Sequence, residues 1–164
     1  MQQPVFVSMQ QYCCSVLLPF DPATGYLPPG VHEADWDVVV ERFGWTPWRR
    51  RLLDGLAEAL DLLSAAGCRR IWLNGSFVTT KEDPGDFDAV WDPDGVDDDV
   101  LDPIFGPLGM LNGRRLQKER FGGEWFPNVV EAGSGAVFAA FFQRDRDARP
   151  KGIVVIQLNK WERS

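Results

Sequence analysis

With 164 residues, of which 45% are hydrophobic, the chain is long enough to bury one core, and we expect a single domain. Its net charge of −7 argues against nonspecific binding to DNA, because contacts to phosphates need clustered lysines and arginines. No apolar run reaches the roughly eighteen residues of a membrane-spanning helix, so we expect no membrane interaction.

The N-terminal part, residues 1–30, is predicted to be an arm followed by a loop. Residues 5–7 and 16–18 favour short strands, whereas residues 19–30 contain too much proline and glycine for a regular helix or a central strand. The three cysteines, at positions 13, 14 and 68, form neither a disulfide framework nor a metal-ligand pattern. They indicate a reducing environment and a cytoplasmic protein.

Two amphipathic helices are expected next. Residues 33–43 have apolar side chains at helical spacing, and His32, the only histidine, is interpreted as a loop residue just before them. The second helix has a clear start signal, with Thr46 as N-cap and Pro47 in the first helical position, and continues to residue 66. Its apolar stripe consists of Leu52, Leu53, Leu56, Leu60 and Leu63, whereas Arg49, Arg50 and Arg51 fall mostly on its polar side.

Two predicted strands then flank a short connection. Residues 69–74 are aromatic and branched, and they lead directly into Gly75 and Ser76. Residues 77–81 favour a helical turn, and a Pro-Gly pair leads into the second strand, residues 86–92. Because side chains alternate along a strand, Asp86 and Asp88 are expected on one face and the apolar residues Phe87, Ala89 and Trp91 on the other.

These residue types suit phosphate chemistry. Two carboxylates on one face of a strand can share a hard cation such as Mg²⁺, which binds through carboxylates and substrate phosphates. Gly75 permits close approach of the backbone, and Ser76 offers an amide and a hydroxyl to a phosphate. Thr79 and Lys81 are further candidate phosphate contacts, although a solvated loop is an equal alternative for this segment.

The pattern resembles the signature of the nucleotidyltransferase superfamily related to DNA polymerase β. Its members carry an apolar strand, a Gly-Ser or Gly-Gly pair, a connection, and an Asp-apolar-Asp motif. Those places are filled here by Leu73, Gly75, Ser76, Asp86, Phe87 and Asp88, with nine residues between Ser76 and Asp86. More loosely, the resemblance extends to the short, antitoxin-type nucleotidyltransferases. It implies an α/β (α+β) fold, with a mixed sheet of about four to six strands flanked by helices.

The same resemblance implies a site. Mg²⁺ or Mn²⁺ would be held by Asp86 and Asp88, and a nucleoside triphosphate would lie over Gly75 and Ser76. A third carboxylate from a later strand would act as a base or a metal ligand. Glu124 is the candidate, because strand-forming aromatic residues follow it and two glycines precede it. The family more often has aspartate at this place, and Glu131 and Asp145 compete with Glu124.

The remaining elements complete a domain predicted over residues 31–164. A short helix is expected over residues 97–105 and a loop over residues 106–113. Residues 136–143 and 153–158 favour two strands, paired antiparallel around a charged hairpin. The hairpin's cations either reach a triphosphate or an acidic partner, or form a solvated tip (Arg144, Arg146, Arg149 and Lys151).

Two functions follow as hypotheses. The first is a metal-dependent nucleotidyltransferase that transfers a nucleoside monophosphate from the triphosphate to a hydroxyl on a protein or RNA, including an antitoxin acting on its toxin. The second is an inactive module of the same fold that masks a partner protein. A calcium loop starting at Asp92 is disfavoured, because Pro103 stands where the closing glutamate should be. A hydrolase is disfavoured because the single histidine has no nucleophile near it in the sequence.

Overall fold

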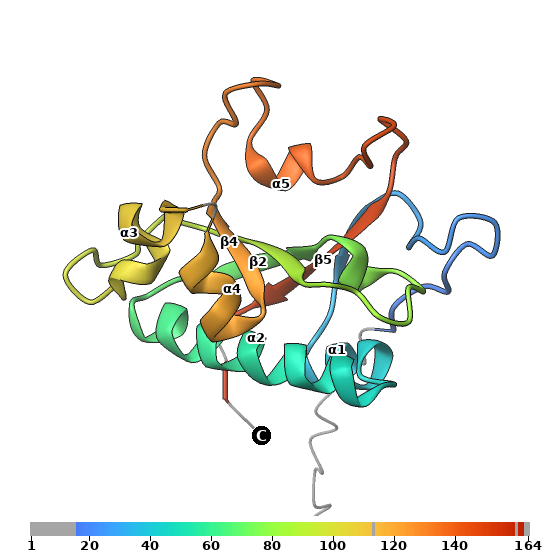
Figure 1. Ribbon diagram of the computed structural model, residues 1–164, viewed down its shortest axis with the longest axis horizontal. Coiled ribbons are helices and arrows are strands. Elements are labelled where there is room, and N and C mark those ends of the chain that lie inside the picture. Colours follow the sequence, from blue (N-terminus) through green and yellow to red (C-terminus); the bar gives the residue numbers. More distant parts are fainter. Residues whose placement is uncertain (1–15, 113, 160, 163–164) are drawn as a thin grey trace, which may run out of the picture.

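The computed structural model describes residues 16–112, 114–159 and 161–162 (Figure 1). The chain forms a five-stranded mixed sheet with the order β1-β5-β2-β3-β4, flanked by helices, which confirms the predicted α+β fold. The strand predicted for residues 5–7 lies outside the described residues, as do two of the cysteines. Residues 16–18 form no strand.

Within the described residues, the elements are five strands, five α-helices and two short 3-10 helices. The strands are β1 (Gly30–Glu33), β2 (Arg70–Asn74), β3 (Phe87–Trp91), β4 (Gly123–Pro127) and β5 (Gly152–Gln157). The α-helices are α1 (Trp36–Phe43), α2 (Pro47–Ala65), α3 (Pro107–Met110), α4 (Arg115–Phe121) and α5 (Phe138–Phe141). The 3-10 helices are η1 (Ser76–Val78) and η2 (Pro103–Phe105).

The main core lies between the sheet and the helices α1 and α2, which run beneath the sheet in Figure 1. The predicted start of α2 is confirmed, since the Thr46 hydroxyl accepts a hydrogen bond of 3.1 Å from the backbone N–H of Arg49. All five leucines of the predicted stripe are buried in this core. Burying side chains of this kind contributes roughly 1.5–3 kcal/mol each, so α2 anchors the sheet.

A smaller core covers the opposite face of the sheet. There Trp72, Val90, Ile153 and Val155 pack with Ala139 of α5, and Figure 1 shows α5 on the side of the sheet away from α2. Strands buried on both faces have apolar side chains throughout rather than in alternation. This accounts for the almost uninterrupted branched residues of β5.

The strand predicted for residues 136–143 is wrong. This segment contains the short helix α5, and the neighbours of β5 are instead β2, which is antiparallel, and β1, which is parallel. Phe138, Phe141 and Phe142 have the spacing of one helical face, and their rings contact one another. Packing of these rings replaces the strand pairing that the apolar composition indicated.

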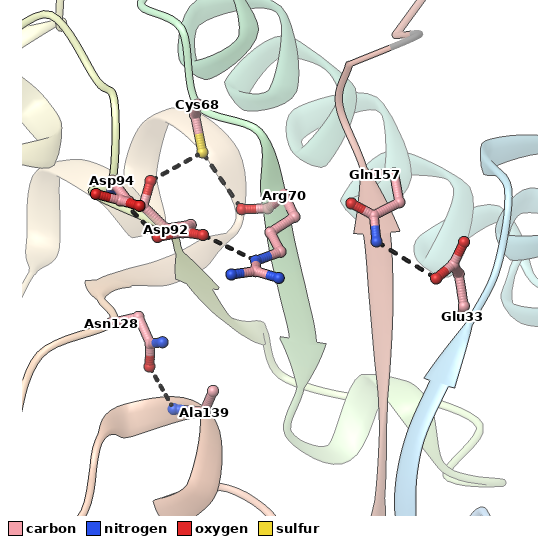
Figure 2. Close-up of polar contacts among 8 residues, drawn as sticks. All are labelled: Glu33, Cys68, Arg70, Asp92, Asp94, Asn128, Ala139 and Gln157. Atoms are coloured by element: carbon pink, nitrogen blue, oxygen red, sulfur yellow. Dashed lines mark hydrogen bonds and ion pairs between the residues drawn. The ribbon is translucent and has the colours of Figure 1, made fainter.

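Strand β1 and the start of α1 also differ from the prediction. Residues 30–33 pair with β5 as an edge strand, and α1 begins at Trp36 rather than at residue 33. His32 therefore lies on β1 and not in a loop, and its Nε2 lies 2.6 Å from the carbonyl oxygen of Pro28. At the last residue of β1, Glu33 accepts a 3.3 Å hydrogen bond from the side chain of Gln157 (Figure 2).

Between β3 and β4 the predicted boundaries of the helix and of the loop are wrong. The helix expected over residues 97–105 is reduced to η2, because Pro103 cannot occupy a helix interior and instead begins a turn that the Asp102 carboxylate caps. The expected loop over residues 106–113 contains α3, which starts at Pro107. In the part of the chain that the structure describes, no helix combines the length and apolar character needed to cross a bilayer.

Candidate functional site

The ends of β2 and β3 bring the predicted acidic pair to the Gly-Ser turn. The two strands are antiparallel, and Asn74 pairs with Asp88 in their register. Phe87, Ala89 and Trp91 lie in the main core, whereas Val90 lies in the smaller core on the opposite face. The predicted phase of β3 is confirmed, and Asp88 faces the side of the sheet that carries α5.

Gly75 makes the close packing of this turn possible. Its φ of 79° is a backbone conformation that L side chains rarely adopt, and a Cβ atom there would collide with the Asp88 carboxylate. Ser76 follows as the first residue of η1. The glycine expected to admit a substrate therefore also admits the carboxylate of the neighbouring strand.

A cleft of about 880 Å³ opens at this point, within the range of small-molecule sites. Its first wall contains six of the seven predicted site residues: Gly75, Ser76, Thr79, Lys81, Asp86 and Asp88. Its second wall comes from α5 and the loop before β5, with Phe141, Phe142, Arg144, Asp145, Arg146, Asp147 and Lys151. Tyr26 and Gly85 complete the lining.

The charged segment of residues 144–151, predicted to be a hairpin, is a loop that contributes to the same cleft as the predicted site. The sequence left two interpretations open for its cations, and the structure brings Arg144, Arg146 and Lys151 to the cleft. Arg149 does not line the cleft and pairs with Asp147 at 3.8 Å. Burial lowers the pKa of Lys151, and the nearby Asp88 carboxylate opposes this shift. A half-buried ammonium close to the acidic pair is a suitable contact for an anionic ligand.

Glu124 does not line the cleft, but it lies next to the acidic pair. It pairs with Asp88 in the parallel register of β3 and β4. The Nζ atom of Lys118 lies 2.8 Å from Glu124 Oε1 and 3.1 Å from Asp86 Oδ2. Hydrogen bonds to Glu124 and then to Asp86 raise the pKa of Lys118. One ammonium therefore holds two of the three predicted carboxylates.

The two competing carboxylates differ in position. Asp145 lines the cleft, where it accepts a 3.2 Å hydrogen bond from the Tyr26 hydroxyl and backbone hydrogen bonds of 2.9 Å from residues 147 and 149. Glu131 lies in the loop after β4, and its carboxylate accepts hydrogen bonds from the backbone N–H groups of Gly133 and Ser134. Glu131 is thus occupied with its own turn and does not line the cleft.

Asp88 is the electrostatically strained member of the group. Burial first, and then the charges of Asp86 and Glu124, raise its pKa from 3.8 to about 6. Among the described residues it forms no ion pair with a lysine or arginine. A carboxylate in this situation is stabilised by any cation that enters the cleft.

The donor set suits a hard cation. Asp86 and Asp88 supply carboxylate oxygens, and the buried Oδ1 of Asn74, across from Asp88, has no hydrogen-bond partner among the described residues. In the same part of the chain, no three His, Cys, Asp or Glu side chains form a preassembled metal site. Asp86 would first have to leave Lys118, so the residues fit a cation that exchanges with this ammonium.

Thr79 has a different role from the predicted phosphate contact. Its hydroxyl donates a 2.7 Å hydrogen bond to the carbonyl of Ser76 and accepts one of 3.2 Å from the backbone N–H of Lys81. These bonds fix the loop that follows the Gly-Ser turn. Ser76 and Lys81 remain available to a ligand on the same wall of the cleft.

The most important residue that the sequence interpretation missed is Arg49. The prediction that it lies on the polar side of α2 is wrong, because Arg49 is fully buried and donates hydrogen bonds of 2.7–3.2 Å to the carbonyls of Phe43, Phe77, Thr79 and Lys81. Burial lowers the pKa of its guanidinium to about 10. A signal was present, since Arg49 precedes Leu52, Leu53 and Leu56 by three, four and seven positions and so belongs to the apolar stripe.

Comparison with protein-family models matches residues 18–157 to a family described as a family of unknown function, DUF6932. No curated protein and no solved structure matches the chain.

Proposed function

We propose that this chain, which belongs to the DUF6932 family, is a metal-dependent nucleotidyltransferase. It would transfer a nucleoside monophosphate from a nucleoside triphosphate to a hydroxyl on a protein or RNA. The observation that carries the proposal is the composition of one cleft, in which Ser76, Asp86 and Asp88 face Arg144, Arg146 and Lys151 from a distant segment. A site of this kind needs carboxylates that hold a cation and positively charged side chains that hold the phosphates.

The phosphates are bound by groups of this chain. Ser76 contributes its hydroxyl, and Lys81 and Lys151 contribute positive charge from opposite walls of the cleft. Arg144 and Arg146 extend this charge along the second wall. Together these four cations offset the negative charge of a triphosphate, which the protein's overall charge of −7 would otherwise repel.

The cation belongs with the acidic pair. Mg²⁺ or Mn²⁺ held by Asp86 and Asp88 would polarise the phosphate oxygens and stabilise the charge that develops on them. Asp88 contributes a carboxylate that forms no ion pair with a lysine or arginine among the described residues, and Asp86 becomes available when it releases Lys118. Lys118 then remains paired with Glu124.

In the transfer step, the acceptor's hydroxyl oxygen forms a bond to the α-phosphorus. The bond from that phosphorus to the oxygen bridging to the β-phosphorus breaks, and pyrophosphate leaves with the electron pair. The hydroxyl proton passes to a carboxylate and then to solvent. Asp145, which lines the cleft, is the candidate acceptor of this proton, and Glu124, which lies across from Asp88 but outside the cleft lining, is the alternative.

A second function is favoured by Lys118. Its ammonium already neutralises Asp86 and Glu124, as expected of a site that no longer binds a cation. The chain would then be a binding module that masks a partner protein, such as the toxin of a toxin–antitoxin pair. Both functions are consistent with a cytoplasmic protein whose described cysteine, Cys68, is a buried free thiol.

The experiment that separates the two functions uses the full chain with Mg²⁺ or Mn²⁺ and each of the four labelled ribonucleoside triphosphates. Acceptors are the chain itself, the protein encoded beside it, and total cellular RNA. We expect transfer of label and release of pyrophosphate by the wild type, and neither by the double variant Asp86→Asn and Asp88→Asn. The variant with Asp94→Asn and Asp98→Asn removes the same charge from an exposed loop and should retain activity.

The outcomes are distinct. Transfer that survives in the double variant would exclude the proposed site. Nucleotide binding without transfer to any acceptor, together with capture of the neighbouring protein by both the wild type and the double variant, would support the binding module. The absence of both binding and transfer would exclude the nucleotidyltransferase.

A further inference from the structure

Aromatic side chains form part of the wall of this otherwise polar cleft. Phe141 and Phe142 line it together with Tyr26, in the same cleft as Ser76 and the acidic pair. Phe141 is the most exposed of the three, with 42% of its surface accessible. Although the Phe141 ring also packs on Phe138 and Phe142, it leaves apolar surface exposed in a polar cleft, where a ligand with an apolar face can cover it.

The helix that carries Phe141 is held in place by its other residues. Ala139 is buried on the sheet, and its backbone N–H donates a 3.1 Å hydrogen bond to the Asn128 side chain (Figure 2). Phe142 packs against the ring of Phe126 with 5.2 Å between ring centroids. Phe141 meets Phe142 at 5.3 Å and Phe138 at 6.3 Å between ring centroids, both in T-shaped arrangements, so its ring is held by two neighbours. Phe141 is therefore presented to the cleft by a fixed element.

We propose that Phe141 is the stacking platform for the nucleobase of the ligand whose phosphates bind at the Gly-Ser turn. This inference rests on the proposed nucleotide site and assigns its specificity, since the ligand must carry an aromatic base and not phosphates alone. Base-to-aromatic stacking tolerates every base, because each base has a π-face. The cleft's volume of about 880 Å³ accommodates a nucleoside beside its phosphates.

The test compares ligands that differ only in the nucleoside. Mg²⁺-ATP and Mg²⁺-tripolyphosphate are titrated into the wild type and into Phe141→Ala, Phe141→Trp and Val137→Ala, with binding followed by calorimetry. Val137 is a matched control, because it is 38% exposed, directly precedes α5 and does not line the cleft. Quenching of 2-aminopurine riboside triphosphate fluorescence reports stacking directly.

In the wild type we expect ATP to bind about tenfold more tightly than tripolyphosphate. Phe141→Ala should remove this difference and the quenching, while leaving tripolyphosphate binding and the thermal unfolding midpoint near their wild-type values. Phe141→Trp and Val137→Ala should retain both the preference for ATP and the fluorescence quenching. If the wild type binds both ligands equally, or if Phe141→Ala keeps the preference for ATP, the stacking role is wrong although the phosphate site stands. If neither ligand binds the wild type, the nucleotide site and the stacking role both fail.

Discussion

Asp88 and Glu124 lie directly opposite each other on the parallel strands β3 and β4. Asp86 is the residue just before β3, so three carboxylates gather at one end of two neighbouring strands. Like charges on facing positions destabilise a sheet unless a cation neutralises them. Lys118 supplies this cation in the absence of a ligand, by pairing with Asp86 and Glu124.

Replacing Lys118 with methionine should make the acidic group more dependent on a divalent cation. Because the lysine side chain is 43% exposed, its loss should lower the free energy of unfolding by no more than about 1 kcal/mol without metal. Added Mn²⁺ should then raise the Tm of Lys118→Met by more than it raises that of the wild type. Lys118→Arg, which keeps the charge, is the control. Equal Mn²⁺-induced shifts in all three proteins would contradict competition between lysine and metal.

The raised pKa of Asp88 predicts that the stability of the metal-free protein depends on pH. Its pKa is raised from 3.8 to about 6, so the folded state holds the proton more tightly than the unfolded chain does. Protonation of Asp88 therefore favours folding fully below pH 4, and this contribution is lost as the pH rises through about 6. At pH 7.5 the loss is at most on the order of 3 kcal/mol.

Asp88→Asn abolishes this titration. Urea unfolding with a chelator present should show that the free energy of unfolding of Asp88→Asn, relative to the wild type, increases between pH 4 and pH 7.5. Asp98→Asn removes an equal charge from an exposed turn and should show no comparable trend. A difference between Asp88→Asn and the wild type that stays constant across this range would mean that Asp88 is not strained by its surroundings.

Gly75→Ala should disturb the acidic pair through the backbone. An alanine would have to adopt a φ near 79° and would place its Cβ against the Asp88 carboxylate. We expect a loss of roughly 1–3 kcal/mol in the free energy of unfolding, together with weaker binding of Mg²⁺-ATP. Gly85→Ala, also in the cleft wall but with nothing within 4 Å of the added Cβ, should be close to wild type in both measurements. Equal stabilities for the two variants would refute the requirement for glycine at position 75.

Local sequence patterns were enough to predict the elements that are determined by contacts between residues close to one another in the sequence. The N-cap at Thr46 and the leucine stripe of α2 depend on contacts within one helix and on one buried face, and both are confirmed. The alternation of β3 was likewise enough to separate Asp88 from Phe87. These features follow from the periods of the helix and the strand, which can be recognised in a single sequence.

The second wall of the cleft depends on contacts that the sequence does not display. Residues 136–143 are apolar enough for a buried strand, but ring contacts with Phe126 and the hydrogen bond from Ala139 to Asn128 hold them as α5 instead. Lys151 lies 63 positions after Asp88 along the chain, yet both line one cleft. Similarly, nothing in the local sequence distinguishes Glu124, the partly buried partner of Lys118, from an exposed glutamate.

Arg49 should be the residue on which the loop after the Gly-Ser turn depends most. Arg49→Met keeps the stem but leaves the carbonyls of Phe77, Thr79 and Lys81 without their donors, so we expect a loss of roughly 2–5 kcal/mol in the free energy of unfolding. Arg50→Met, next in the chain, removes a guanidinium whose one hydrogen bond among the described residues goes to Gly44, and it should cost less than about 1 kcal/mol. Urea unfolding measures both values, and hydrogen exchange of residues 77–81 should accelerate only in Arg49→Met. Comparable stabilities for the two variants, or unchanged exchange in this loop, would show that Arg49 does not hold it in place.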